Sequence, residues 1–314
     1  MKRKIIQIAD STQLVSLPRK WAVEHGLKKG DEVDVKEEGN RIIVSSGERN
    51  AEYTETEIQI DGLDKDSLIF LLRGLYIRGY DQIRFRFDNP LIEHHRFNKK
   101  VTISSVIHKE VGICQGLDII QESRNQFVIK NISVSSIKEF DNILRRVFLL
   151  LIDAAKDLHL GAKEGDFVLL ESMQDKHDNI TRLINYNLKT LNTIGYVEHK
   201  NNQVLFSILF SLDLVIDILK NVSREIIENK LKIEPRALDI MAKVVESIQL
   251  YYNLFYNFSF SKASSFVKAK QDVLDIIKKQ IKNLSKEDVR IVVMVESALE
   301  VLRDLYSARM AMEY

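Results

Sequence analysis

The distribution of glycine and proline constrains this chain more than any other sequence feature. All twelve glycines of the 314 residues lie at or before Gly195, so the last 119 residues contain none. Pro235 is the one proline in the second half, at a position that suits a first helical turn. Because glycine and proline both destabilise a helix interior, their scarcity favours long helices over strands and loops. The sequence therefore predicts a first part with short elements and glycine turns, followed by a helical remainder.

Composition narrows the class of protein. The chain has 46 Lys and Arg against 45 Asp and Glu, for a formal net charge of +1, so any strongly charged surface must be local. A length of 314 residues is enough for roughly two or three domains, and 45% hydrophobic residues are typical of globular proteins. The single cysteine, Cys114, excludes an intramolecular disulfide and a multi-cysteine metal site.

The sequence lacks the pattern of a membrane span or a secretory signal. The longest uninterrupted run of aliphatic and aromatic residues, Val147–Ile152, is far shorter than the ~20 residues that cross a bilayer. The basic N-terminus is not followed by the apolar core of a signal peptide. We therefore expect a cytoplasmic protein without membrane insertion.

Residues 2–46 contain short alternations of apolar and polar residues, as on half-buried strands. Pro18 stands where a first helical residue would, Gly26 where that helix would end, and Gly39-Asn40 would form a hairpin turn. A segment of about 45 residues with so few apolar groups cannot form a good core alone. We therefore predict that residues 1–48 are a separate domain that folds as an obligate homodimer.

Three elements of this segment resemble the AbrB/SpoVT swapped-hairpin DNA-binding domain. They are the run Ile8-Ala9-Asp10, the pair Leu17-Pro18, and the Gly-Leu and Gly-Asp-x-Val-x-Val pattern within residues 26–35. In that family two chains exchange hairpins into one small barrel, and basic side chains on one face contact DNA. The resemblance implies a swapped-hairpin β-barrel and DNA as a partner.

Basic side chains at the start of this segment could neutralise DNA phosphates and make binding sensitive to salt. The candidate DNA-binding residues are Lys2, Arg3, Lys4, Arg19 and Lys20. The sequence departs from the family where Gln13-Leu14 and Ala22-Val23 stand in places that often hold arginine. Dimerisation without DNA binding is therefore the alternative role for residues 1–48.

Residues 49–134 are predicted to be a small α/β connecting subdomain. The pattern predicts strands at 57–60, 82–87, 118–122 and 126–130, with helices at 64–80 and 101–112. We find no chemical motif in this segment. His94, His95 and His108 lack the spacing of a tight metal site and are interpreted as surface or satisfied histidines.

From residue 135 onward, apolar residues recur at the three- and four-residue spacing of amphipathic helices. Three helices precede Pro235, and three more are predicted over 236–258, 260–283 and 286–313. The two sets look like copies of one unit, so residues 135–314 predict two tandem antiparallel three-helix bundles. The expected fold is thus multi-domain and mainly α.

The copies also share an acidic pattern on their third helices. Asp213 and Asp217 correspond to Glu300 and Asp304, 87 residues on. Two bundles with this pattern resemble the PhoU fold, and Ala298–Asp304 is similar to the Glu-Arg-Ile-Gly-Asp stretch of that family. A swapped-hairpin domain joined to a PhoU-like half resembles archaeal phosphate-uptake regulators.

Acidic residues four apart lie on one helix face and repel one another unless they are neutralised. A divalent or trivalent cation bridging them would relieve that repulsion, and the PhoU resemblance implies metal binding, since some members hold metal clusters. The candidate metal ligands are Asp213, Asp217, Glu296, Glu300 and Asp304. The alternative is a solvated face balanced by nearby arginines. His177, between Asp175 and Asp178 but on a different face, is interpreted as structural.

No catalytic motif or phosphate-binding loop is present in the sequence, so we expect a non-enzyme without an organic cofactor. The resemblances imply a transcriptional regulator of phosphate homeostasis that binds DNA and senses metal or phosphate status through its helical half. The alternative is a dimeric interaction protein that does not bind DNA and docks on a phosphate transporter or a signalling protein.

Overall fold

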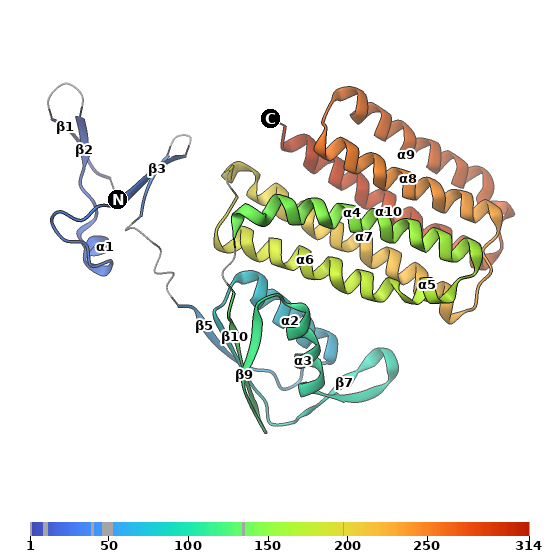
Figure 1. Cartoon of the computed structure of the whole chain (residues 1–314), viewed down its shortest axis with the longest axis horizontal. Coiled ribbons are helices and arrows are strands. Elements are labelled where there is room, and N and C mark those ends of the chain that lie inside the picture. Colours follow the sequence, from blue (N-terminus) through green and yellow to red (C-terminus); the bar gives the residue numbers. More distant parts are fainter. Residues whose placement is uncertain are drawn as a thin grey trace. The chain divides into compact units, whose positions relative to one another are not determined.

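The computed structural model of the chain describes residues 2–8, 12–38, 41–45, 53–133, 136–196 and 198–313. These residues form two compact units, Met1–Tyr53 and Thr54–Tyr314 (Figure 1). The quoted residues Ala9 and Asp10 and the predicted turn at Gly39-Asn40 lie outside the described residues. The second unit contains both the predicted connecting subdomain and the predicted helical half.

The first unit consists of two antiparallel hairpins and a short helix. Strand β1 (Ile5–Ile8) pairs with β2 (Thr12–Val15), and β3 (Asp34–Glu38) pairs with β4 (Arg41–Ser45). Helix α1 (Arg19–Glu24) begins after Pro18, which caps the helix instead of being its first residue. Among the residues of this unit whose side chains the structure describes, none is buried. The prediction that the segment lacks a core of its own is therefore confirmed.

The second unit begins with a four-stranded sheet in the order β5-β6-β10-β9. Strand β5 (Glu55–Gln59) is parallel to β6 (Gln82–Arg86), and β10 (Gln126–Asn131) is antiparallel to β6 and to β9 (Leu117–Ser123). Helices α2 (Lys65–Arg78) and α3 (Ile103–Ile113) pack together and share one apolar core with the sheet. The predicted strands and helices of this segment are confirmed to within a few residues.

A hairpin in this sheet-bearing part was not predicted. Strands β7 (Leu91–His94) and β8 (Lys99–Thr102) flank a short 3-10 turn, His95–Phe97. In these four-residue strands Ile92 is buried and Val101 is partly buried, so the apolar alternation is too short to predict a strand from the sequence. Helix α3 begins at Ile103 and not at Val101, because Thr102 ends the hairpin and its hydroxyl accepts a hydrogen bond from the Ser105 amide.

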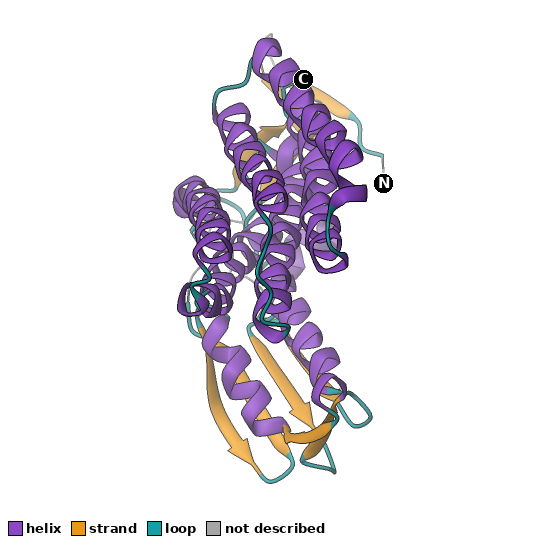
Figure 2. Ribbon diagram, turned by 90° about the vertical axis from the view of Figure 1, so that its right-hand side faces the viewer, coloured by secondary structure: helices purple, strands orange, loops and turns teal. Residues whose placement is uncertain are grey.

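The helical body comprises seven helices that run side by side (Figures 1 and 2). They are α4 (Phe140–Glu164), α5 (Phe167–Glu171), α6 (Met173–Thr193), α7 (Asn202–Glu228), α8 (Pro235–Tyr256), α9 (Phe260–Gln280) and α10 (Lys286–Ala311). The short α5 was not predicted, but the six long helices occur in the predicted order. Helix α7 packs against both α6 and α10, and α8 packs against α4, so the two sets of helices share one continuous apolar core.

Helix α7 is the one described helix that is long and apolar enough to cross a membrane, by length and composition alone. In this structure it carries an apolar face into the core, where Leu209, Leu212 and Ile216 are fully buried. Other apolar side chains of the same helix face outward, since Phe210 is 48% and Leu214 50% exposed.

The sheet-bearing part and the helical body are joined by contacts between α2 and α6. The Asn192 amide donates to the Ile77 carbonyl at 2.8 Å, and the Lys189 ammonium donates to Asn131 Oδ1 at 2.8 Å. Gly79, which ends α2 with a φ of +90°, lies so close to Thr193 that a side chain there would collide with it. These contacts place α2, α3 and the β7–β8 hairpin over one side of α6 and α7.

Candidate functional site

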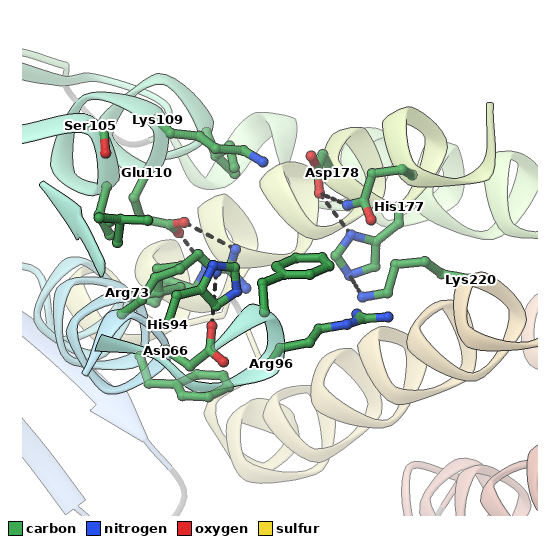
Figure 3. Close-up of a pocket in the computed structure, with 18 of the residues that line it drawn as sticks. Asp66, Arg73, His94, Arg96, Ser105, Lys109, Glu110, His177, Asp178 and Lys220 are labelled. Atoms are coloured by element: carbon green, nitrogen blue, oxygen red, sulfur yellow. Dashed lines mark hydrogen bonds and ion pairs between the residues drawn. The ribbon is translucent and has the colours of Figure 1, made fainter. Parts of the chain in front are cut away.

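A cleft of about 700 Å³ lies where the sheet-bearing part meets the helical body (Figure 3). It is bounded by α2, α3 and the β7–β8 hairpin on one side and by α6 and α7 on the other, and we call it the junction cleft. Its volume falls within the range of pockets that hold small organic ligands. Seven Lys and Arg side chains and five carboxylates line it, with His94 and His177.

The centre of the body-side wall is the buried ring of His177. Its Nδ1 lies 2.8 Å from Asp178 Oδ1, and its Nε2 lies 2.9 Å from Asp217 Oδ1 (Figure 3 shows the first contact). The Lys220 ammonium lies 3.0 Å from the same Nε2 and forms an ion pair with Asp217. The His177 ring thus links a carboxylate on its own helix to a carboxylate on α7.

The protonation of this group follows from its contacts. Burial alone would lower the pKa of His177, but hydrogen bonds to Asp178 and Asp217 leave that pKa raised above its usual value. Burial alone would raise the pKa of Asp217, but His177 and Lys220 lower it to about 2. At neutral pH Asp217 is therefore ionised and its charge is balanced by two cationic or hydrogen-bonding neighbours.

The opposite wall is fixed by a buried ion pair. Arg73 on α2 donates through Nε and Nη2 to the Glu110 carboxylate on α3, with Nη2 3.2 Å from Oε2 (Figure 3). The Glu110 side chain is 3% exposed, so its charge is balanced by Arg73 and not by water. Removal of either partner would leave a buried charge, which is strongly destabilising.

Three cations of the junction cleft have no carboxylate within 4 Å among the described residues: Lys99, Lys109 and Arg224. Arg224 donates instead to the Gln174 amide oxygen at 3.1 Å and to the Asn221 amide oxygen at 3.3 Å. Arg96, also in the cleft, is paired with Glu228 at 3.0 Å. The cleft therefore keeps an excess of positive charge that its own carboxylates do not balance.

The structure brings only one predicted metal ligand into the junction cleft. Asp217 lines it, whereas Asp213, one turn earlier on α7, accepts a 2.6 Å hydrogen bond from the Thr181 hydroxyl on α6. Burial raises the pKa of Asp213. Since the His177 ring stands between Asp178 and Asp217, these three groups do not converge on one point.

The remaining predicted ligands lie on α10. Glu300 is paired with Lys270 and with Arg303, each at 3.0 Å, and Asp304 lies 3.6 Å from Arg303. Glu296 is half-buried one turn before Glu300. In the part of the chain that the structure describes, no three His, Cys, Asp or Glu side chains are arranged to hold a metal ion. The metal site stays a prediction.

The interpretation of His177 as a purely structural residue missed its place in the junction cleft. One signal was available, because Thr181 follows it by four residues and so shares its helix face. The two acidic residues that this face meets, Asp213 and Asp217, are also four apart. Matching stripes on two helices indicate a polar contact, although periodicity alone does not show which helices pack together.

The predicted DNA-binding residues all lie in the first unit and are exposed. Lys2, Arg3 and Lys4 directly precede β1, and Arg19 and Lys20 begin α1 after β2. Because Ile5 is opposite Val15 in the hairpin, both groups emerge from the same end of it. Lys20 also lies 3.7 Å from Glu24, an exposed pair of little energetic weight.

Comparison with known proteins assigns a class to the first unit. Residues 6–51 match the family model described as antidote-toxin recognition MazE, bacterial antitoxin. This match covers most of the segment that resembles the AbrB/SpoVT domain, so a MazE/AbrB-type domain at the N-terminus is confirmed.

A search of solved structures finds a similarity to a PhoU-like protein from Shewanella oneidensis MR-1. The two chains are 13% identical, and the match covers 57% of this chain and 96% of that chain with a TM-score of 0.40. No curated protein matches the chain.

Proposed function

We propose that this protein is a homodimeric DNA-binding transcriptional regulator of phosphate homeostasis, and not an enzyme, whose second unit binds a small anionic ligand. The observation that carries the proposal is the first unit itself. It is MazE-type by its sequence match, and it has no buried side chain among its described residues.

The exposed apolar side chains of the first unit support assembly with a second copy. Ile5 is 68% exposed, Val35 62% and Ile42 67%, and all three lie on strands. Strands that expose apolar side chains and unpaired edges are unstable in water unless another chain covers them. A second copy of the same hairpins is the partner that the MazE/AbrB-type class supplies.

The basic residues support DNA as the ligand of that dimer. Five cationic side chains emerge from one end of the β1–β2 hairpin, and two-fold symmetry would double their number on the assembled domain. Contacts to phosphates supply most of the affinity of nonspecific DNA binding and make it depend on salt. The junction cleft, with its excess of cations, supports the sensing of an anion by the second unit.

The proposal is tested by DNA binding of the full-length chain. We expect a dimer by light scattering and binding to random duplex DNA at low salt, measured by fluorescence anisotropy. Arg3→Ala with Arg19→Ala and Lys20→Ala should weaken binding to all sequences alike and flatten the salt dependence by about one unit per lost phosphate contact.

A matched control removes three exposed cations from the second unit: Lys163→Ala, Lys282→Ala and Arg303→Ala. These substitutions should leave DNA binding unchanged. If the unmodified dimer fails to bind duplex DNA at about 50 mM salt, the first unit serves dimerisation alone. The protein would then act by docking on a phosphate transporter or a signalling protein.

A further inference from the structure

The junction cleft is too large and too varied in chemistry for inorganic phosphate alone. A phosphate ion would occupy a small part of about 700 Å³ and would leave most of the lining in contact with water. Pockets of this size bury most of the surface of a small organic ligand. The side chains that line the junction cleft therefore indicate what else such a ligand contains.

Two aromatic side chains of the junction cleft are more than half exposed to solvent. Phe70 on α2 is 69% exposed, and Phe97 in the turn of the β7–β8 hairpin is 60% exposed. The Phe97 ring is held edge-on by the His94 ring at 4.8 Å between centroids, and His94 is itself buried. A fixed, exposed ring in a cleft is a surface on which a flat aromatic group can stack.

Cations surround the Phe97 ring. The Arg96 guanidinium lies 5.5 Å and the Lys99 ammonium 5.6 Å from its centroid. Arg224 on α7 also lines the junction cleft. Burial, and to a smaller extent the nearby charge of Arg96, lowers the pKa of Arg224. Like charges held close together in this way gain free energy from an anion between them.

The carboxylates of the junction cleft do not cancel this attraction. Asp217 is balanced by His177 and Lys220, Glu110 by Arg73, and Glu228 by Arg96. The cations left without a carboxylate, Arg224, Lys99 and Lys109, remain available to a ligand (Figure 3 shows Lys109 reaching toward the body-side wall).

We propose that the junction cleft binds a nucleoside phosphate, with the base against Phe97 and the phosphates held by Arg224, Lys99 and Lys109. This inference rests on the proposed function, because it names the class of anion that the second unit senses. It places the effector in the second unit and leaves the first unit to DNA.

The test is calorimetric titration of the full-length chain with four nucleoside diphosphates, ADP, GDP, CDP and UDP, and with inorganic pyrophosphate. Pyrophosphate carries two linked phosphates without a ribose or a base. We expect at least one nucleotide to bind about tenfold or more tightly than pyrophosphate, the gain typical of one stacked base. Phe97→Ala should reduce the affinity for that nucleotide to that for pyrophosphate.

Two substitutions outside the junction cleft are matched controls. Phe260→Ala removes a ring that is 65% exposed on α9, and Arg303→Ala removes an arginine that is 63% exposed on α10. Both should leave nucleotide binding unchanged. Arg224→Ala should weaken the nucleotide and pyrophosphate by the same factor. Melting temperatures equal to that of the parent would show that each variant is folded.

The inference is overturned if none of the four nucleotides binds more tightly than pyrophosphate, or if Phe97→Ala binds the nucleotide as the parent does. DNA binding is measured on the same samples. A protein that binds DNA but no nucleotide keeps the proposed function and loses this inference. A protein that binds nucleotide but no DNA loses the DNA-binding function and keeps the nucleotide site.

Discussion

The two units of the chain differ in where their apolar and charged side chains find partners. In the second unit, apolar residues from six long helices meet in one core, and most charges of the junction cleft are paired within the unit. In the first unit, both hairpins expose apolar side chains, and no side chain among the described residues is buried. Stability in one unit is therefore intrinsic, whereas in the other it must come from assembly.

The largest expected effect comes from breaking assembly. Val35→Asp with Ile42→Asp places charges on the exposed apolar strands of the first unit and should abolish the dimer, because a buried unpaired charge is very costly. The second unit should keep its own unfolding transition in the scanning calorimeter. Light scattering measures the loss of the dimer, and limited proteolysis shows which unit has opened.

The matched control is Val293→Asp, at a valine that is 51% exposed on α10 of the second unit. It should leave both the dimer and the calorimetric transition unchanged. A double variant of the first unit that stays dimeric would show that the exposed strands are not the assembly surface. The conclusion that the first unit is stabilised by assembly through these strands would then be wrong.

The sequence predicts an element well where its ends are marked by local signals, and poorly where they are not. Helix α2 was predicted closely because its ends are local signals: Asp64 caps it by accepting from the Ser67 amide, and Gly79 adopts the left-handed conformation that ends it. The β7–β8 hairpin turns few apolar side chains inward, chiefly Ile92 and Val101, and it has no glycine turn. It was missed, and with it the wall that carries Phe97.

Sites that depend on tertiary contacts could be predicted only in part. The pair Asp213 and Asp217 was singled out as candidate metal ligands, since its spacing is visible in the sequence. The groups that balance Asp217 could not be foreseen together, because Lys220 is on the same helix but His177 is on α6. Which helix faces which is decided by packing of the whole body and not by the period of one helix.

A second prediction concerns a buried lysine of the second unit that has no carboxylate partner among the ion pairs of the described residues. Lys189 on α6 is 2% exposed, donates to Asn131 Oδ1 and lies 4.9 Å from the centre of the Tyr76 ring. Burial lowers its pKa to about 8 from a usual value of 10.5. Since the unfolded chain then binds more protons between these values, the free energy of unfolding should rise with pH across that window.

Lys189→Met tests this directly. The parent should gain about 3 kcal/mol of stability relative to the variant as pH rises from 8 to 10.5, since each unit of pKa difference is worth about 1.4 kcal/mol. Denaturant unfolding at a series of pH values measures it. Lys163→Met, at an exposed lysine, is the control and should follow the parent. If the free energy of unfolding of Lys189→Met changes with pH as that of the parent does, the pKa of Lys189 is not lowered by folding.

The smallest expected effect is that of a metal ion, because the second unit already balances its predicted ligands. A cation at Asp217 must displace Lys220 and His177, and a cation at Glu300 must displace Lys270 and Arg303. Because of this competition we expect the cation to bind weakly, with a dissociation constant no lower than about the metal concentration used in the experiment. A cation present at a concentration equal to its dissociation constant stabilises the fold by about 0.4 kcal/mol, which is ~1 °C in melting temperature for a unit of this size.

Scanning calorimetry with added manganese, and after treatment with a chelator, measures that shift. Asp217→Asn and Glu300→Gln, made separately, show which helix carries it, because the variant that lacks the true ligand should no longer respond. Asp157→Asn, at a carboxylate paired with Lys176 at 2.7 Å outside both sets, is the control and should respond as the parent does. A shift of many degrees would show that the cation is integral to the body, so that the second unit, like the first, depends on a partner. No shift at all, with no metal in elemental analysis, would leave its carboxylates to their lysine and arginine neighbours.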